Sequence, residues 1–191
     1  MSSPLADVLA RIRAAAEHAG VRWYIFGAQA AILMGASRLT ADIDVTMLLG
    51  QRDVTDLLAA LESRGFRLRI PGDPEGFIAR TRVLPMVDAV SNMPVDVVLG
   101  GPGLEEAFAD RADVLDVGGI LVPVISPEDL IVTKVLASRP KDLDDVVAVL
   151  AARRDDIDAA QVRSTLRLLE GALGQSDLLP AFEKLWEAAR R

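Results

Sequence analysis

The sequence predicts an α/β protein in which a sheet with flanking helices is followed by a C-terminal helical bundle. Two observations lead to this prediction. Over the first two-thirds of the chain, glycine and proline turn signals separate short apolar runs typical of strands from segments with helical spacing. From Ser126 onward only helical patterns remain. We therefore expect an α/β domain over residues 1–125 and a helical region over residues 126–191.

The chain is expected to begin with a helix and a buried strand. Apolar residues recur at helical spacing over about residues 4–18, and Gly20 closes this helix. Residues 21–26 are rich in β-branched and aromatic side chains, which favours a strand. A compact helix of small residues then covers residues 28–36, and alternating apolar residues predict a second strand over residues 43–49.

The middle of the chain is expected to be mainly extended. Asp53 caps a helix that ends at Gly65. Extended segments are expected at residues 66–70, 76–84, 86–90, 95–99, 114–117 and 120–124. The sequence PGDPEG is interpreted as the turn between the first two of these, and GGPG ends the strand over residues 95–99.

Four helices are expected after residue 125. Ser126 is a suitable N-cap, with Pro127 at the first helical position and Asp129 in the first turn, so a helix runs to about Ala137. The other three are expected from about residue 140 to 150, from 159 to 170 and from 178 to 189.

The composition excludes several kinds of active site. With 51% apolar residues among 191, the chain is not of the disordered class. It has no cysteine, which removes disulfides, cysteine zinc sites and thiol nucleophiles. A Ser/His/Asp triad could only use the single histidine, His18, which we interpret as a helix-surface residue. Carboxylates must therefore provide most ligands of any metal, which favours Mg²⁺ or Mn²⁺.

The N-terminal pattern and the net charge limit the localisation and the kinds of binding partner that we expect. The N-terminus lacks the basic head and apolar core of a signal peptide, and the longest apolar stretch, residues 23–36, is shorter than the ~20 residues that cross a bilayer. We expect a cytoplasmic protein with no membrane partner. The net charge of −7 argues against general charge attraction to nucleic acid but leaves room for a local basic cleft.

Three aspartates could form a metal site. Asp42 and Asp44 are two residues apart at the start of a strand, so their side chains share one face. Asp96 stands between valines in a run that otherwise reads as an interior strand. If the two strands are neighbours, the three carboxylates meet and can hold two divalent ions for attack on a phosphate. The alternatives are that Asp-x-Asp, a common pattern, binds no metal and that Asp96 caps a turn.

The segment before the aspartate pair is suited to a triphosphate. The strand-to-helix turn at Gly27 and Ala28 brings backbone N–H groups toward an anion. Arg38 and Thr40 then add a cation and a hydroxyl just before Asp42.

This order of residues resembles the nucleotidyltransferase superfamily related to DNA polymerase beta. The matching segments are FGAQAAILMGASRLTADIDVTM and VDVVLG. Within the superfamily, the chain is most similar to AbiEii-type toxin proteins and their bacterial relatives, because Arg-x-Thr-x-Asp-Ile-Asp is paired with the helical segment SPEDLIVTKVLASRPKDLDDVVAVL. The resemblance extends from about Val21 to Leu150 and implies the nucleotidyltransferase fold, with a mixed sheet.

The resemblance assigns roles to individual residues. It implies that Asp42 and Asp44 are ligands of the Mg²⁺, or Mn²⁺, that carries a nucleoside triphosphate. It implies that Asp96 is the third ligand and the general base, or orienting group, for the acceptor hydroxyl. It also implies that Gly27 provides the turn that binds the phosphates. Ala28 departs from the family, which usually has Gly or Ser there, and this puts tight triphosphate binding in doubt.

The downstream helices contribute two further nucleotide-binding residues by resemblance. Lys134 reaches the triphosphate, the alternative being a solvated helix lysine. Asp142 matches the acidic residue of the family's Lys-Asp segment, with Asp145 as a rival.

The implied function is Mg²⁺-dependent transfer of a nucleoside monophosphate to a hydroxyl, with release of pyrophosphate. The acceptor is RNA, particularly a tRNA end as in toxin relatives, or a small molecule such as an aminoglycoside. A local basic wall, or only a solvated face, is formed by Arg64, Arg67, Arg69, Arg80 and Arg82. The alternative is a catalytically degenerate member that binds nucleotide or metal and acts as a toxin–antitoxin interaction module with a cognate antitoxin.

Overall fold

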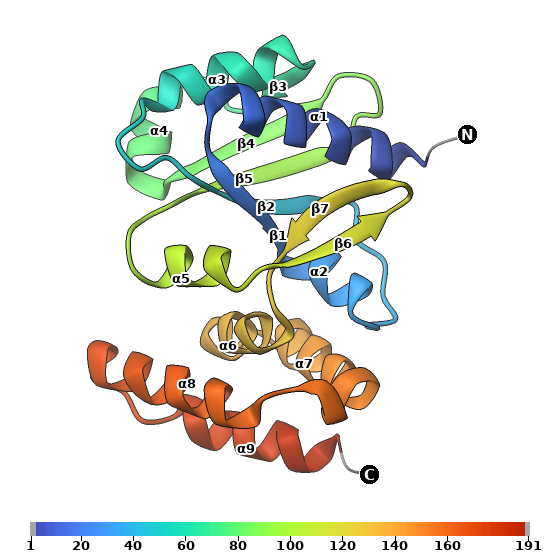
Figure 1. Cartoon of the computed structure of the whole chain (residues 1–191). Coiled ribbons are helices and arrows are strands. Elements are labelled where there is room, and N and C mark those ends of the chain that lie inside the picture. The colour runs from blue at the N-terminus through green and yellow to red at the C-terminus, as the bar shows by residue number, and fades with distance from the viewer. Residues whose placement is uncertain (1–2, 190–191) are drawn as a thin grey trace. The chain divides into compact units, whose positions relative to one another are not determined.

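The computed structural model describes residues 3–189, with Arg154 as backbone only, and divides into two compact units (Figure 1). The first unit contains the chain before Gly27 and Thr40–Ile125. The second unit contains Gly27–Leu39 and the chain from Ser126 onward.

The first unit is built on one mixed sheet. Its strands are β1 (Arg22–Phe26), β2 (Ile43–Leu48), β3 (Phe66–Leu68), β4 (Val83–Asp88), β5 (Pro94–Gly100), β6 (Asp113–Val117) and β7 (Ile120–Val124). They lie in the order β3-β4-β5-β2-β1-β7-β6. The pairs β2–β5 and β1–β7 are parallel, and the other pairs are antiparallel. The mixed sheet that the resemblance implied is confirmed.

Helices cover the two faces of this sheet unequally. On one face lie α1 (Pro4–Ala19) and α3 (Val54–Ser63), which contact each other (Figure 1). On the other face α5 (Leu104–Asp110) contacts β1 and β2. The helix α4 (Pro74–Thr81) contacts β4 and has no buried residue. The core therefore lies mainly between the sheet and the α1 and α3 helices.

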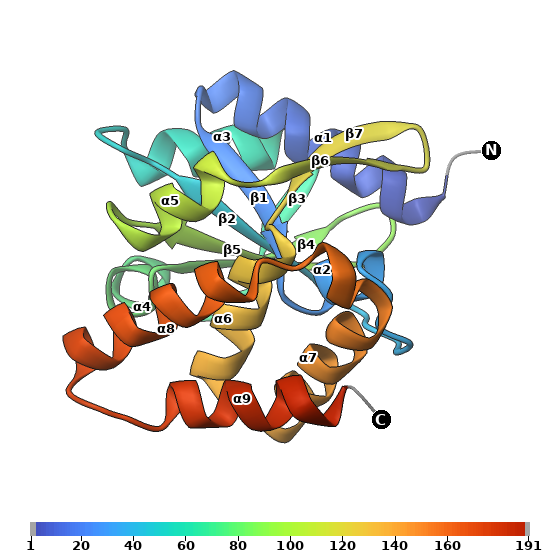
Figure 2. The same ribbon diagram turned by 60° about the horizontal axis from the view of Figure 1, so that its bottom comes forward.

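The second unit is helical within the described residues (Figure 2). It contains α2 (Gly27–Leu33), α6 (Pro127–Ala137), α7 (Pro140–Arg153), a 3₁₀ turn (Arg154–Asp156), α8 (Ala159–Leu173) and α9 (Leu178–Ala188). Residues 27–39 group with the C-terminal helices and not with the sheet, because α2 packs on α6 and α7 through buried small side chains such as Ala30 and Ala31.

Two middle segments differ from the sequence prediction. Residues 76–84 were expected to be extended, but Pro74–Thr81 form α4. The reason is that the Asp73 carboxylate accepts a hydrogen bond from the Gly76 N–H at 2.9 Å and Pro74 takes the first helical position, so GDPEG starts a helix. The helix α5 was not predicted from the sequence, although acidic residues, which favour a helix N-terminus, occupy its first turn.

The predicted start of α6 is confirmed. The Ser126 hydroxyl accepts a hydrogen bond from the Asp129 N–H at 3.2 Å, and Pro127 opens the helix. None of the helices within residues 3–189 has both the length and the apolar content that spanning a membrane requires.

Candidate metal and nucleotide site

The structure brings the three predicted aspartates together. In the parallel pairing of β2 with β5, Asp44 is the register partner of Asp96. Asp42 lies just before β2, two residues from Asp44. One carboxylate oxygen from each of the three lies within 4.8 Å of the others, and all three residues are half-buried. We call this cluster the aspartate triad.

On the face opposite to the aspartates, the strands that carry the triad are buried. Side chains that alternate with the aspartates are at most 1% exposed, namely Ile43, Val45, Val95 and Val97. Since successive strand residues point to opposite faces, burying these valines and isoleucine directs the aspartates to the side away from α1 and α3. Apolar packing therefore fixes where the carboxylates point.

Neighbouring side chains orient the carboxylates of Asp42 and Asp96. The Thr40 hydroxyl donates a hydrogen bond to Asp42 Oδ1. Arg69 Nη2 donates to Asp96 Oδ1 at 2.6 Å, while Arg69 Nε donates to the Met86 carbonyl at 2.8 Å. Thr40 was predicted as a nucleotide contact. Its hydroxyl here also positions a predicted metal ligand.

The triad has the chemistry of a site for a hard divalent cation. Three carboxylates within 4.8 Å of one another repel unless positive charge lies among them. Arg69 forms an ion pair with Asp96 and so offsets part of this charge. Carboxylate oxygens are the ligands that Mg²⁺ and Mn²⁺ prefer, so the residues present fit such an ion.

Gly27 and Ala28 form the start of α2. Gly27 has a φ of 66°, a left-handed conformation that favours glycine, and it follows Phe26, the β1 register partner of Asp44. The Ala28 side chain is buried. The glycine at this position is therefore required by the backbone, independently of any ligand.

Lys134 lies in a buried ion-pair cluster of the second unit. Its Nζ donates to Asp142 Oδ1 at 3.0 Å and to Asp145 Oδ2 at 2.7 Å. Arg38 Nη1 donates to Asp145 Oδ2 at 2.9 Å, and Arg139 pairs with Asp142. Lys134 is 6% exposed, so the alternative of a solvated helix lysine is wrong. Both Asp142 and Asp145 thus accept a hydrogen bond from Lys134.

The charge of this cluster, which we call the Lys134 cluster, sets the protonation of Asp142. Burial raises the pKa of the Asp142 carboxyl, but hydrogen bonds from Arg139 and Lys134 outweigh it and hold that pKa below its usual value. A cleft of about 400 Å³ beside it is lined by Ala36, Ser37, Arg38, Lys141, Asp144, Asp145 and Ala148.

Arg69 is a residue beside the triad whose contact with Asp96 the sequence did not show. It was one of five arginines in a predicted basic wall, with no particular partner. Its contact with Asp96 depends on the order β3-β4-β5, which no local pattern reveals. Arg82 instead donates to the Leu99 carbonyl at 3.0 Å. His18 is exposed on α1, as predicted.

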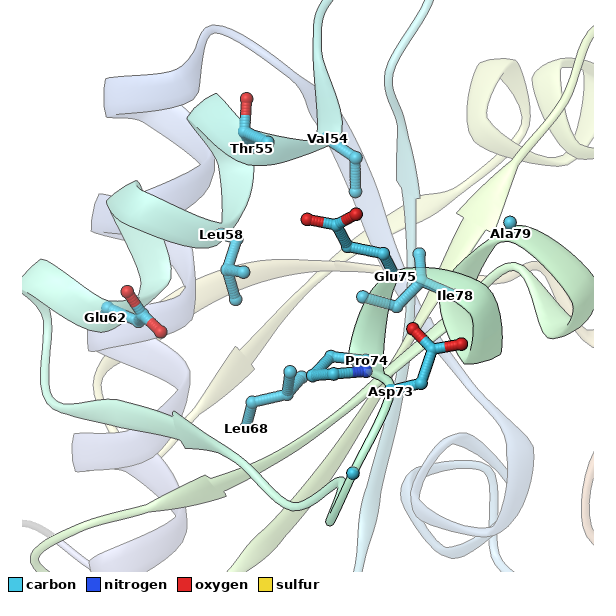
Figure 3. A pocket seen from close by; sticks show the side chains of 11 residues that line it. Val54, Thr55, Leu58, Glu62, Leu68, Asp73, Pro74, Glu75, Ile78 and Ala79 are labelled. Atoms are coloured by element: carbon cyan, nitrogen blue, oxygen red, sulfur yellow. The ribbon is translucent and has the colours of Figure 1, made fainter.

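A separate cleft of about 960 Å³ lies between α3 and α4 (Figure 3). Its lining is mainly apolar, and the carboxylates of Glu62, Asp73 and Glu75 also border it. Asp73 is already the N-cap of α4. None of the site residues predicted from the sequence lines this cleft.

Comparison with known proteins identifies a family. A family model described as "Nucleotidyltransferase of unknown function (DUF6036)" matches residues 3–166. None of the curated proteins matches the chain.

Solved structures with a similar fold are nucleotidyltransferases or resemble them. A solution structure of the antibiotic-resistance factor ANT(2'')-Ia has a TM-score of 0.59 and 17% identity, covering 91% of this chain and 95% of that one. A nucleotidyltransferase-like protein from Paracoccidioides brasiliensis has a TM-score of 0.54 and 17% identity, with 96% and 94% covered. A crystal structure of ANT(2'')-Ia with adenylyl-2''-tobramycin has a TM-score of 0.51 and 19% identity, with 98% of each chain covered. At these identities the likeness shows the fold alone.

Proposed function

Because the chain belongs to the nucleotidyltransferase family of unknown function DUF6036, we propose that it transfers a nucleoside monophosphate from a triphosphate to an acceptor hydroxyl at the aspartate triad. The ion is Mg²⁺, or Mn²⁺ in its place, and its ligands are Asp42, Asp44 and Asp96. The observation that carries this proposal is the meeting of three carboxylates from two separate strand regions within 4.8 Å.

In the proposed reaction, the acceptor oxygen forms a bond to the α-phosphorus while the bond to the leaving pyrophosphate breaks. A divalent ion, when bound, supplies charge neutralisation of the triphosphate. Asp42, oriented by Thr40, and Asp44 hold the nucleotide's ion, and Asp96 orients the acceptor hydroxyl and takes its proton. The protein thus acts by positioning and by electrostatics, and no protein nucleophile is needed.

Further roles are proposed for the other residues that the sequence predicts to bind the nucleotide. Gly27 provides the turn for the phosphates, with Ala28 beside it, and Arg38 contributes positive charge. The Lys134 cluster holds Arg38 through Asp145, so Lys134 and Asp142 act on the nucleotide through the position of Arg38. Direct contact of Lys134 with the triphosphate stays a prediction.

The acceptor and the biological setting are proposed more broadly. The fold shared with ANT(2'')-Ia, whose complex holds an adenylylated tobramycin, supports a small hydroxylated acceptor. The resemblance to AbiEii-type toxins supports an RNA or tRNA acceptor, a cognate antitoxin and a cytoplasmic location. Under this proposal residues 1–125 carry the metal ligands, and residues 126–191 form the C-terminal helical region.

A second candidate is a degenerate member that binds nucleotide or metal without turnover and serves as an interaction module. The alanine at position 28, where the superfamily usually has glycine or serine, favours it. Retention of the whole triad favours catalysis.

Pyrophosphate release from each nucleoside triphosphate, with and without Mg²⁺, tests the proposal. We expect Asp44→Asn to lower the Mg²⁺-dependent rate about a thousandfold, because ion stabilisation of the transition state is worth several kcal/mol. Asp56→Asn is the matched control, since Asp56 is an exposed aspartate on α3 outside the triad. Equal rates for Asp44→Asn and the wild type would refute the catalytic assignment. Nucleotide binding without any pyrophosphate release in the wild type would support the degenerate candidate.

A further inference from the structure

The sheet has a partly exposed surface beside the triad. On β4 and β5, the side chains that point toward α1 and α3 are fully buried, namely Leu84, Met86, Val95 and Val97. The side chains that alternate with them are half-buried, and they are Val83, Pro85, Val87, Pro94 and Val98. We call this second side the open face. Asp96 belongs to it, between Pro94 and Val98, so a molecule that lies on the open face lies next to the triad.

Arg69 stands at the same level of the sheet as the triad. Asp96 is the register partner of Asp44 on β2 and of Pro85 on β4. The Arg69 backbone N–H donates to the Pro85 carbonyl at 2.7 Å. Residues at one level of a sheet share a face, so the Arg69 side chain also lies on the open face, where it meets Asp96.

Two anchors fix the Arg69 guanidinium and leave part of it available. A guanidinium has five N–H donors in a planar fork. Within residues 3–189, hydrogen bonds to the Met86 carbonyl and to Asp96 engage two of them. The Arg69 side chain is 36% exposed. Its remaining donors can therefore reach a ligand without disturbing the contact with Asp96.

A second cation lies on the same side. Arg67 is two residues before Arg69 and pairs in register with Val87, so its side chain is also on the open face. It is exposed and forms no ion pair with another residue of the described part of the chain. The aspartates of the triad are the ligands of the proposed ion. Arg67 and Arg69 are therefore cations that an acceptor on this surface meets.

Resting on the nucleotidyl transfer proposed above, we propose that Arg69, assisted by Arg67, forms an acceptor subsite for alcohols that carry a phosphate group near the attacking hydroxyl. The arginine fork matches phosphate oxygens, and like charge disfavours a polycationic acceptor such as an aminoglycoside. During transfer the hydroxyl oxygen bonds to the α-phosphorus, pyrophosphate leaves with the electron pair of the broken bond, and the hydroxyl proton passes to Asp96. Arg69 makes and breaks no covalent bond and is a specificity-determining residue.

The test compares acceptors of different charge in the pyrophosphate-release assay with the full chain. The probes are ribose 5-phosphate as a phosphate monoester, a short RNA oligomer as a phosphodiester, ribose as the neutral match, and tobramycin as the cation. The variants are Arg69→Gln, Arg69→Lys and Arg67→Gln. Arg52→Gln is the control, since Arg52 is an exposed arginine after the end of β2 that is opposite to Asp44.

We expect kcat/KM of the wild type to be higher for at least one phosphate-bearing acceptor than for ribose. Arg69→Gln should lower that preference about 10- to 100-fold, the range of one or two charge-assisted hydrogen bonds. Arg69→Lys should restore part of it, Arg67→Gln should lower it less, and Arg52→Gln should leave it unchanged. The two phosphate probes distinguish a small phosphorylated alcohol from an RNA.

Two results would overturn the assignment while leaving the proposed function intact. One is a wild-type preference for tobramycin or ribose. The other is an Arg69→Gln variant that slows every acceptor by the same factor, which would limit Arg69 to fixing Asp96. If no acceptor, and not even water, gives Mg²⁺-dependent pyrophosphate, the proposed function fails and the acceptor subsite fails with it.

Discussion

At the scale of single residues, burial determines whether a charged side chain needs partners of opposite charge. Lys134 is 6% exposed, and removing an ammonium group from water is costly unless carboxylates face it. Asp142 and Asp145 both do so, at 3.0 and 2.7 Å. The lysine is therefore part of the structure of the second unit, whatever it contributes to nucleotide binding.

Lys134→Met tests this structural role. It removes the shared partner of two buried carboxylates, so the free energy of unfolding should fall by about 3 kcal/mol. Urea unfolding measures the change, and Lys184→Met is the control, because Lys184 is exposed on α9. Unchanged stability together with a raised KM for the triphosphate would show instead that Lys134 serves the nucleotide and not the fold.

At this scale the sequence predicted that the three aspartates meet, but not that Lys134 is buried. Asp44 and Asp96 stand among valines and isoleucine, so their strands and the facing direction of their side chains follow from the local pattern. Lys134 follows no such rule. Most residues of α6 from Pro127 to Val135 are buried on several sides, so helical spacing alone does not predict which of its faces meets solvent.

Among the elements, α1 and the turn between β4 and β5 are joined by a buried carboxylate. Asp88 is 0% exposed and accepts hydrogen bonds from the Arg11 guanidinium and from the backbone and hydroxyl of Ser91. Burial raises the pKa of Asp88, but the bonds from Ser91 and Arg11 outweigh it and hold that pKa below its usual 3.8. This anchor fixes the turn from which β5 brings Asp96 to the triad.

The lowered pKa gives a pH-dependent stability. A carboxylate that ionises more readily in the folded state stabilises that state above its unfolded pKa and loses the contribution as pH falls. We expect Asp88→Asn to lower the free energy of unfolding by about 2 kcal/mol at pH 7. The difference from the wild type should shrink once the pH falls below 3.8. Urea unfolding at pH 7 and at pH 3 measures both values, and a difference that does not change with pH would contradict this account.

A second contact between elements depends on a glycine. Gly35, at the end of the α2 segment, has a φ of 111°, and a Cβ there would lie 2.6 Å from the Ala152 Cβ on α7. Gly35→Ala should therefore destabilise the protein by about 2 kcal/mol, through backbone strain and overpacking.

A matched variant separates the two causes. Gly65 has a φ of 88°, and a Cβ there meets nothing within 4 Å, so Gly65→Ala reports strain alone. The double variant Gly35→Ala with Ala152→Gly should recover the overpacking part, as thermal or urea unfolding would show. Equal losses for Gly35→Ala and Gly65→Ala would contradict close packing of this segment on α7.

The predictability of elements depended on how local their signals are. The capped helices α1 and α6 have start signals inside their own sequence. The prediction of a turn and an extended segment in place of the helix α4 was wrong because proline and glycine in GDPEG suit both a turn and a helix start. The Arg69–Asp96 contact depends on the pairing of β3 with β4 and of β4 with β5, which joins segments distant in sequence.

For the whole molecule, the chain passes between its two units three times, after Phe26, Leu39 and Ile125. The sequence suggested one division, at Ser126, because composition changes there. It did not show that Gly27–Leu39 groups with the C-terminal helices, since that grouping depends on packing of α2 against α6 and α7. The family model, over residues 3–166, includes residues of both units.

The aspartate triad is the premise of the whole account, and Mn²⁺ binding followed by electron paramagnetic resonance tests it most directly. We predict that the wild type depletes the signal of free Mn²⁺. Asp42→Asn, Asp44→Asn and Asp96→Asn should each weaken Mn²⁺ binding more than about tenfold. Replacing a residue that only supports a metal ligand already weakens binding by about this factor. Asp56→Asn should bind as the wild type does. Wild-type affinity in the Asp96→Asn variant would contradict the account, because the three carboxylates would then not share one ion.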